Sequence, residues 1–200
     1  MKWASFFLIS IGLVIMCYPK IMTLYHAHQE EQLLKTWQET GKDSAQEEYR
    51  KLDDVFGQKE TETTHTPVEG ELLGTLQIPK IDLLLPIVEG AGRSQLKIAA
   101  GHLTGTEPIG TKGNAAIAAH RSYTYGRQFN RLNEVTIGDQ MSIDTKGKKI
   151  TYTVFDKRIV APSDTSVLQS KGNQGMITLI TCEPMKHTTK RLIVQARKQS

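Results

Sequence analysis

The sequence predicts an all-β domain, a closed barrel or a sandwich, from about Leu72 to the C-terminus. Short aliphatic and β-branched runs follow one another at close spacing, turn residues separate them, and few stretches have the period of a helix. The composition, 38% hydrophobic and 23% charged, is that of a folded protein. At 200 residues the chain has room for one such domain and accessory segments.

The N-terminal segment, residues 1–25, predicts a membrane anchor. Residues 4–25 form a stretch of 22 residues in which Lys20 is the only charge, which is long enough for a transmembrane helix. A cleaved signal peptide is the alternative, but bulky residues at 17–20 replace its usual small-x-small cleavage site. The charge of Lys2 and the amino terminus favours an N-terminus inside the cell. We therefore expect a single-pass protein of the cell membrane with its main domain outside.

An acidic stalk and linker, residues 26–71, is expected to follow the anchor. This segment carries 5 Lys/Arg against 12 Asp/Glu, whereas residues 72–200 carry 18 against 9. Apolar residues recur loosely at helical spacing before Gly41, and residues 57–71 are almost free of apolar side chains. The expected order is therefore an anchor, a partly helical stalk with a linker, and the β-domain at 72–200.

The positive charge of the β-domain does not predict a nucleic-acid partner. The basic residues are scattered, and no aromatic residues alternate with them to form a stacking platform. A solvated basic surface, or an anionic partner such as a cell wall or membrane, explains the charge.

Eight strands are expected in the β-domain, together with short helices at 94–100 and 128–135 and a hairpin turn at Lys146-Gly147. The strands are expected at 73–78, 83–88, 114–120, 140–144, 149–155, 157–161, 175–182 and 191–196.

A lone cysteine ends one of the apolar strands. Cys182 closes the run 175–182, and Pro184 prevents the strand from continuing in a ladder. Because Cys17 lies in the predicted anchor, Cys182 has no partner for an internal disulfide, and a single thiol in an exported domain suggests a chemical purpose. The alternative is a buried cysteine that acts as a small hydrophobic residue.

Two histidines are candidates for the proton partner of this thiol. His120 ends a predicted strand and enters a polar loop, so it approaches Cys182 if both strands end on the same side of one sheet. A neighbouring imidazole activates a cysteine as a nucleophile. His102 is the rival candidate, but it follows a predicted helix, and we prefer His120.

Arg191 begins the last predicted strand and is the candidate for an electrostatic role. A short loop separates it from the strand of Cys182, so it can return beside the thiol. A guanidinium there stabilises an oxyanion or holds a substrate backbone. The alternative is a surface arginine next to Lys190.

Taken together, these segments resemble the signature of the sortase family. The run 178–182 (TLITC), followed after a short loop by Arg191, is similar to the cysteine segment of the family, and 118–121 (AAHR) is similar to its histidine segment. Two stretches within 76–90, LQIPKI and LPIVEG, are similar to its first strands. The resemblance covers about residues 72–197.

The resemblance implies a closed eight-stranded β-barrel with short helices, acting outside Gram-positive cells. It implies a cysteine transpeptidase, in the broad hydrolase and thiol-protease class, that cleaves an LPxTG-like sorting signal after threonine. Cys182 would hold the secreted protein as a thioester, and an amine of a peptidoglycan precursor or a pilin would resolve it. His120 would act as general acid and base, and Arg191 would stabilise the oxyanion.

The resemblance also implies a substrate groove, a subclass and no cofactor. Thr181 and the loop 163–172, with Ser163 and Leu168, would line the groove. The absence of a second apolar anchor and of an Asp-Pro pair speaks against the pilin-polymerising type, and the short loop between Cys182 and Arg191 with the uncleaved anchor is most like class D, with class A next. Calcium activation, seen in some members, needs clustered acidic residues; those of the β-domain are isolated, so no metal is expected.

Two other readings remain open on the sequence. The first is an exported cysteine peptidase that uses the same dyad and releases its product to water. The second is a non-catalytic, wall-binding β-domain in which Cys182 is part of the core.

Overall fold

The computed structural model describes residue 18 and residues 21–22, 25–36, 67–185 and 189–199. Residues 25–36 are helical, within the range for which the sequence predicts a helix. Most of the predicted anchor, and residues 37–66 of the predicted stalk, lie outside the described residues. Among the residues that are described, no helix is long and apolar enough to cross a membrane.

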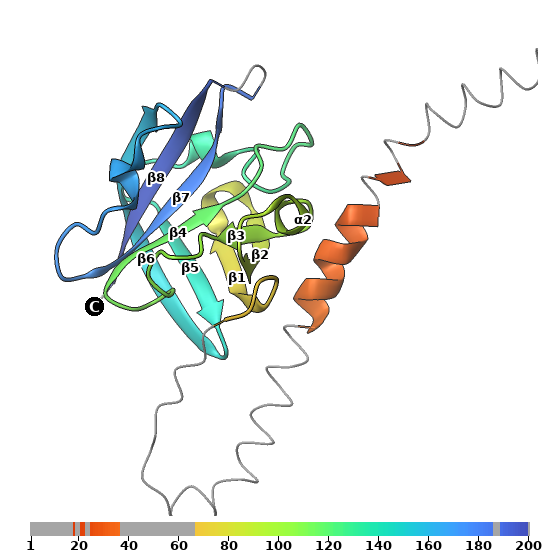
Figure 1. Cartoon of the computed structure of the whole chain (residues 1–200), viewed down its shortest axis with the longest axis horizontal. Helices are drawn as coiled ribbons and strands as arrows, with labels where there is room; N and C mark the ends of the chain where they lie inside the picture. Colours follow the sequence, from red (N-terminus) through yellow and green to blue (C-terminus); the bar gives the residue numbers. More distant parts are fainter. Residues whose placement is uncertain (1–17, 19–20, 23–24, 37–66, 186–188, 200) are drawn as a thin grey trace, which may run out of the picture.

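Eight strands and a few short helical turns make up residues 72–198 (Figure 1). The elements are β1 (Leu72–Ile78), η1 (Pro79–Ile81), β2 (Leu83–Glu89), α2 (Arg93–Leu96), β3 (Ala100–His102), β4 (Gly113–Ala118), η2 (Leu132–Glu134), β5 (Gln140–Thr145), β6 (Lys148–Val160), η3 (Thr165–Leu168), β7 (Gly175–Glu183) and β8 (Lys190–Lys198).

The strands form one closed barrel in the order β1-β2-β3-β4-β7-β8-β6-β5. The pairs β2–β3 and β4–β7 are parallel, and the other pairs are antiparallel. Pairing of β1 with β5 closes the sheet, which leaves no free strand edge. The barrel, and not a sandwich, is therefore the correct form of the predicted all-β domain.

Several predicted strands and helices differ in detail from the structure. The strands expected at 149–155 and 157–161 are one continuous strand, β6, whose register shifts between Val154 and Asp156. The short strand β3 lies where the sequence predicts the end of a helix, and the helix is only the four residues of α2. The helix expected at 128–135 is reduced to the 3-10 turn η2. The predicted hairpin at Lys146-Gly147 is confirmed, with φ of 47° and 82° at the two turn residues.

Alternation along the strands separates an inner face from an outer face. In β7, Ile177 and Leu179 belong to the buried core, which also contains large side chains from the other strands, such as Tyr152 and Phe129. The residues between them, such as Thr178 and Ile180, face outward. The same alternation in β4 and β8 gives these three adjacent strands one common outer face.

Buried polar side chains lie on this outer face, where η3 covers it. Asn114, Thr178 and Gln195 are at most 2% exposed. The side-chain amides of Asn114 and Gln195 both donate to the carbonyl oxygen of Val167 at 3.0 Å. The Thr178 hydroxyl donates to Asn114 Oδ1 at 2.8 Å. This network fixes η3 against the barrel, and on the same face exposure increases at the other ends of the strands.

Candidate active site

Three neighbouring strands bring the predicted catalytic residues together at one end of the barrel. Cys182, in β7, lies directly opposite Arg191, in β8. The parallel ladder of β4 and β7 pairs Ala118 with Ile180, so two residues further on His120 comes level with Cys182. Cys182 therefore has His120 on one side and Arg191 on the other. Figure 1 shows the three strands side by side.

All three side chains belong to the outer face. Side chains alternate between the two faces, and the residue next to each of the three on the inner face is buried: Ala119, Thr181 and Leu192. His120 is exposed, and Cys182 and Arg191 are half-buried. Cys182 is a free thiol. A substrate lying along the outer face can therefore reach the thiol, the imidazole and the guanidinium from solvent.

The rival histidine does not belong to this site. His102 pairs with Ile117, a core residue of β4, and is itself only 5% exposed. Its Nδ1 lies 2.8 Å from Glu89 Oε2, and its Nε2 lies 3.0 Å from the carbonyl oxygen of Glu107. Both ring nitrogens are thus engaged away from the face that carries Cys182.

The backbone on either side of His120 is held by hydrogen bonds. The amide of Ala119 donates to Ile180 O at 3.2 Å, and the amide of Phe129 donates to His120 O at 3.1 Å. Phe129 is fully buried, so it ties the loop after His120 to the core. The histidine stands two residues past the end of β4, and these contacts fix its position there.

Thr181 supports this backbone from the inner face. It is 2% exposed, and its hydroxyl donates to Ala119 O at 2.9 Å. Since adjacent strand residues face opposite sides, its side chain points away from the face of Cys182. The sequence predicts Thr181 as a groove residue, but its side chain does not share the face of Cys182, and it instead joins the end of β4 to β7.

An ion pair joins the residues that follow the histidine and the cysteine. Arg121 Nη1 donates to Glu183 Oε2, and the two side chains are 9% and 22% exposed. A further link joins the same two loops, since the Tyr123 hydroxyl donates to Met185 O at 3.0 Å. Sequence reasoning missed this pair, although Arg121 and Glu183 are the next neighbours of His120 and Cys182 in the chain.

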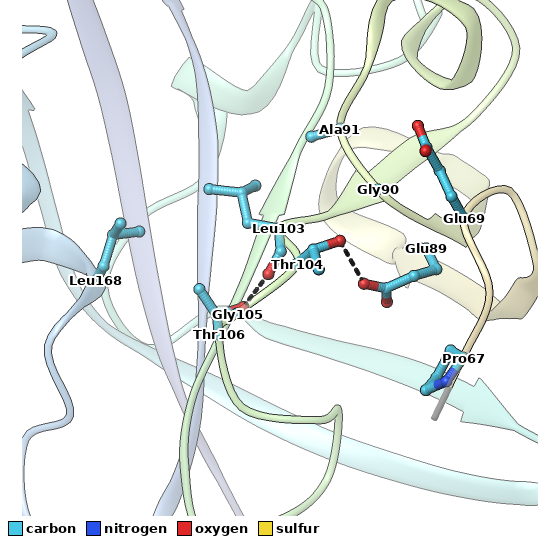
Figure 2. A pocket seen from close by; sticks show the side chains of 10 residues that line it. All are labelled: Pro67, Glu69, Glu89, Gly90, Ala91, Leu103, Thr104, Gly105, Thr106 and Leu168. Carbon is cyan, nitrogen blue, oxygen red and sulfur yellow. Dashed lines mark hydrogen bonds between the residues drawn. The ribbon is translucent and has the colours of Figure 1, made fainter. Parts of the chain in front are cut away.

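A cavity of about 580 Å³ opens near the covered end of the outer face (Figure 2). Leu168 of η3 lines it on one side, and residues 103–106 line it on the other. Of the two loop residues predicted for the groove, Leu168 lines this cavity, whereas Ser163 is exposed and does not line it. Within the part of the chain that the structure describes, no three His, Cys, Asp or Glu residues are grouped to hold a metal ion.

Comparison with known proteins now decides the family. A family profile described as the sortase domain matches residues 76–199, more than half of the chain. The chain belongs to the sortase family. Sortase D of Bacillus subtilis (strain 168) is 28% identical over 200 residues, which cover 98% of each protein.

Solved sortase structures share this barrel. A Clostridium perfringens sortase D5 transpeptidase superposes with a TM-score of 0.70 at 25% identity, covering 87% of this chain and 100% of that chain. A lid mutant of sortase A from Corynebacterium diphtheriae superposes with a TM-score of 0.61 at 30% identity, covering 70% of this chain and 74% of the other. Sortases are cysteine transpeptidases that anchor proteins to the cell wall. Cys182, His120 and Arg191 are thus neighbours in a fold that is used for this chemistry.

Proposed function

We propose that this sortase cleaves an LPxTG-like sorting signal after its threonine and joins the protein to an amine of a cell-wall precursor. The observation that carries the proposal is the row of Cys182, His120 and Arg191 on one open face of three adjacent strands. The relative named sortase D, which matches over almost the full length, supports class D.

Acylation is the first half of the proposed reaction. The Cys182 thiolate attacks the threonine carbonyl carbon, and the carbonyl electron pair moves to oxygen. Arg191, opposite Cys182 in the ladder, donates hydrogen bonds to that oxyanion. The oxyanion then re-forms the carbonyl, the C–N bond breaks, and His120 gives a proton to the departing amine. The secreted protein is left as a thioester on Cys182.

Transfer is the second half. His120, now neutral, accepts a proton from the incoming amine as its nitrogen attacks the thioester carbon. Collapse of the second tetrahedral species breaks the C–S bond, forms the new amide and returns the thiolate. Water in place of the amine would give hydrolysis, so product analysis separates a transpeptidase from a peptidase.

The test uses the full chain in detergent, with peptides that contain LPxTG-like sequences. Triglycine or diaminopimelate serves as the amine, and mass spectrometry reads the products. We expect a thioester adduct and an amine-ligated product, both lost in Cys182→Ala and strongly reduced in His120→Asn. Hydrolysis without ligation would support the peptidase, and turnover that survives Cys182→Ala would reject the nucleophile. Binding to cell wall without any turnover would support the non-catalytic domain.

We also propose that residues 1–25 anchor the protein in the cell membrane with the barrel outside. The support is the apolar stretch 4–25 and the family's work at the cell wall. Protease added to intact protoplasts is expected to degrade the barrel, and full protection of the barrel would reject this orientation.

A further inference from the structure

A buried carboxylate and imidazole lie side by side outside the catalytic row. Glu89, at the end of β2, is 6% exposed, and His102, at the end of β3, is 5% exposed. Glu89 Oε2 and His102 Nδ1 are 2.8 Å apart. Burying two titratable groups costs desolvation free energy unless both groups make good hydrogen bonds, so this pair is expected to have a structural or functional role. The proposed reaction does not use it.

The hydrogen bonds of the pair lead to the connection between β3 and β4. His102 Nε2 faces the carbonyl oxygen of Glu107 at 3.0 Å, and since a carbonyl only accepts, Nε2 carries a proton. Glu89 Oε1 accepts from the Thr104 hydroxyl at 2.6 Å. The Thr106 hydroxyl lies 3.1 Å from Nε2 and donates to Leu103 O at 2.7 Å. The turn at 103–107 is thus wrapped around the pair.

The same turn forms one wall of the cavity of about 580 Å³. Figure 2 shows Glu89 and Thr104 joined at the cavity, with Leu103 beside them and Leu168 on the opposite side. The amide of Leu103 donates to Ala116 O at 2.8 Å, which extends the ladder of β3 and β4 by one position. Since His102 is level with the core residue Ile117, alternation directs the next side chain, that of Leu103, to the outer face, which also carries Cys182.

The separation from Cys182 fits a short extended peptide. Leu103 is level with Ala116, which pairs with Thr178, four positions before Cys182 in β7. The separation is therefore roughly 13 Å along the strands and, because β3 and β7 are two strands apart, about 10 Å across them. The three residues that precede the acylated threonine of an LPxTG-like signal extend over about 10 Å. The backbone therefore ends short of Leu103, and the side chain of the first residue of the signal, an apolar one, would extend into the space between Leu103 and Leu168.

We propose that Glu89, His102 and Thr104 form a clasp that positions the wall at 103–107 and so sets selection for the first residue of the sorting signal. These are positioning residues, because they act through Leu103 and the turn and not on the reacting atoms. A wall that is already ordered costs less entropy when the peptide binds. The inference rests on the proposed function for its substrate.

The test compares two peptides and three variants in the full chain. One peptide has leucine as the first residue of the signal, and the other has alanine there. Thr104→Val removes one hydrogen bond of the clasp, and Glu89→Gln removes its charge with little change of shape. Thr151→Val, a half-buried β6 threonine that lines neither this cavity nor the clasp, is the control. Thermal unfolding checks that each variant is folded.

We expect Thr104→Val to raise KM for the leucine peptide about tenfold with kcat little changed, as for loss of one hydrogen bond to a charged group. The alanine peptide should be affected much less, so discrimination between the two peptides falls. The control should change neither value. An equal loss for both peptides, or a loss confined to kcat, would overturn the clasp.

A binding measurement separates this inference from the proposed function. Labelled leucine and alanine peptides are titrated into Cys182→Ala with and without Thr104→Val. If the wild type turns over the peptides and Thr104→Val discriminates between leucine and alanine as strongly as the wild type does, only the clasp is rejected. Failure of the wild type to turn over either peptide rejects the proposed function, and the clasp is then decided by whether Thr104→Val removes the preference for leucine in binding.

Discussion

Cys182 and Arg191 are directly opposed residues of the antiparallel ladder between β7 and β8. This pairing fixes the backbone of Arg191 relative to that of Cys182, and the Arg191 guanidinium donates from Nη1 to Lys190 O at 3.0 Å. Side chains opposite each other in such a ladder lie about 5 Å apart at their Cβ atoms. The ladder thus places Arg191 within reach of an oxygen that forms on a carbonyl bound to Cys182.

Arg191→Lys is expected to lower kcat by roughly 100-fold, because an ammonium cannot reproduce the paired donors of a guanidinium. Single-turnover acylation of the full chain, followed by mass spectrometry, measures the effect. Arg197→Lys is the matched control, since Arg197 lies on the same strand with its guanidinium carbon 4.2 Å from the ring centre of Phe155. Equal activity of the two variants would rule out the oxyanion role.

The ion pair between Arg121 and Glu183 is expected to couple stability and catalysis. Removing either partner leaves a largely buried charge unpaired, so Arg121→Gln or Glu183→Gln should lower the free energy of unfolding by about 2 kcal/mol. The double variant should lose less than the sum of the two. Because the pair ties the loop of His120 to that of Cys182, kcat should fall in parallel, with KM less affected.

Glu134→Gln is the control for this cycle. It breaks the ion pair with Arg131, which lies three residues away; the Glu134 side chain is 42% exposed, so the change should leave both the melting temperature and kcat nearly unchanged. Additive effects of Arg121→Gln and Glu183→Gln on stability and on kcat would show that the ion pair does not hold the two loops together.

The row of Cys182, His120 and Arg191 could be predicted from the sequence because each of these residues ends or begins an apolar run. The strand period of two also places Thr181 on the opposite face from Cys182, so its absence from the groove follows from the sequence alone. In β6 the register shift after Val154 reverses which residues face inward, and this breaks one strand into two apparent runs. β3 has only three residues, and its strand conformation depends on pairing with β2 and β4.

The two buried polar networks could not be predicted in the same way. Glu89 and His102 are 13 residues apart, and Asn114 and Thr178 are 64 apart. Neither pair has a periodic pattern that would mark it, since a buried polar residue depends on partners that only the folded chain supplies. For this reason the cavity wall at 103–107 could not be predicted from the sequence.

Phe129 is expected to link core packing to the position of His120. It is fully buried, and its amide donates to His120 O. Phe129→Leu should lower the free energy of unfolding by about 1–2 kcal/mol and also reduce kcat, because the loop loses its anchor. Val154→Ala, a core change in β6, should cost comparable stability with little change in kcat. If Phe129→Leu and Val154→Ala reduce kcat equally, the loss of activity comes from core packing in general and not from the contact between Phe129 and the loop of His120.

The helix at 25–36 is expected to dock on the barrel in a pH-dependent way. Glu30 Oε2 lies 2.5 Å from Arg127 Nη2, in the loop that follows His120, and Leu34 lines a cavity of about 280 Å³ with residues of β1, β2 and β5. Burial raises the pKa of the Glu30 carboxyl, and the Arg127 guanidinium offsets this only in part. The docked helix therefore binds a proton more tightly than the free helix does.

Docking should consequently be strongest below the usual glutamate pKa of about 4.3 and weaken as the pH rises through the raised pKa of Glu30. Hydrogen exchange of residues 25–36, corrected for the intrinsic pH dependence of amide exchange, measures this. Glu30→Gln imitates the protonated carboxyl, so it should dock at all pH values and remove the dependence. Glu31→Gln, which changes an exposed carboxylate paired with Lys35 in the same helix, should retain it. Protection that increases with pH in the wild type would show instead that the ion pair with Arg127 outweighs the cost of burying Glu30.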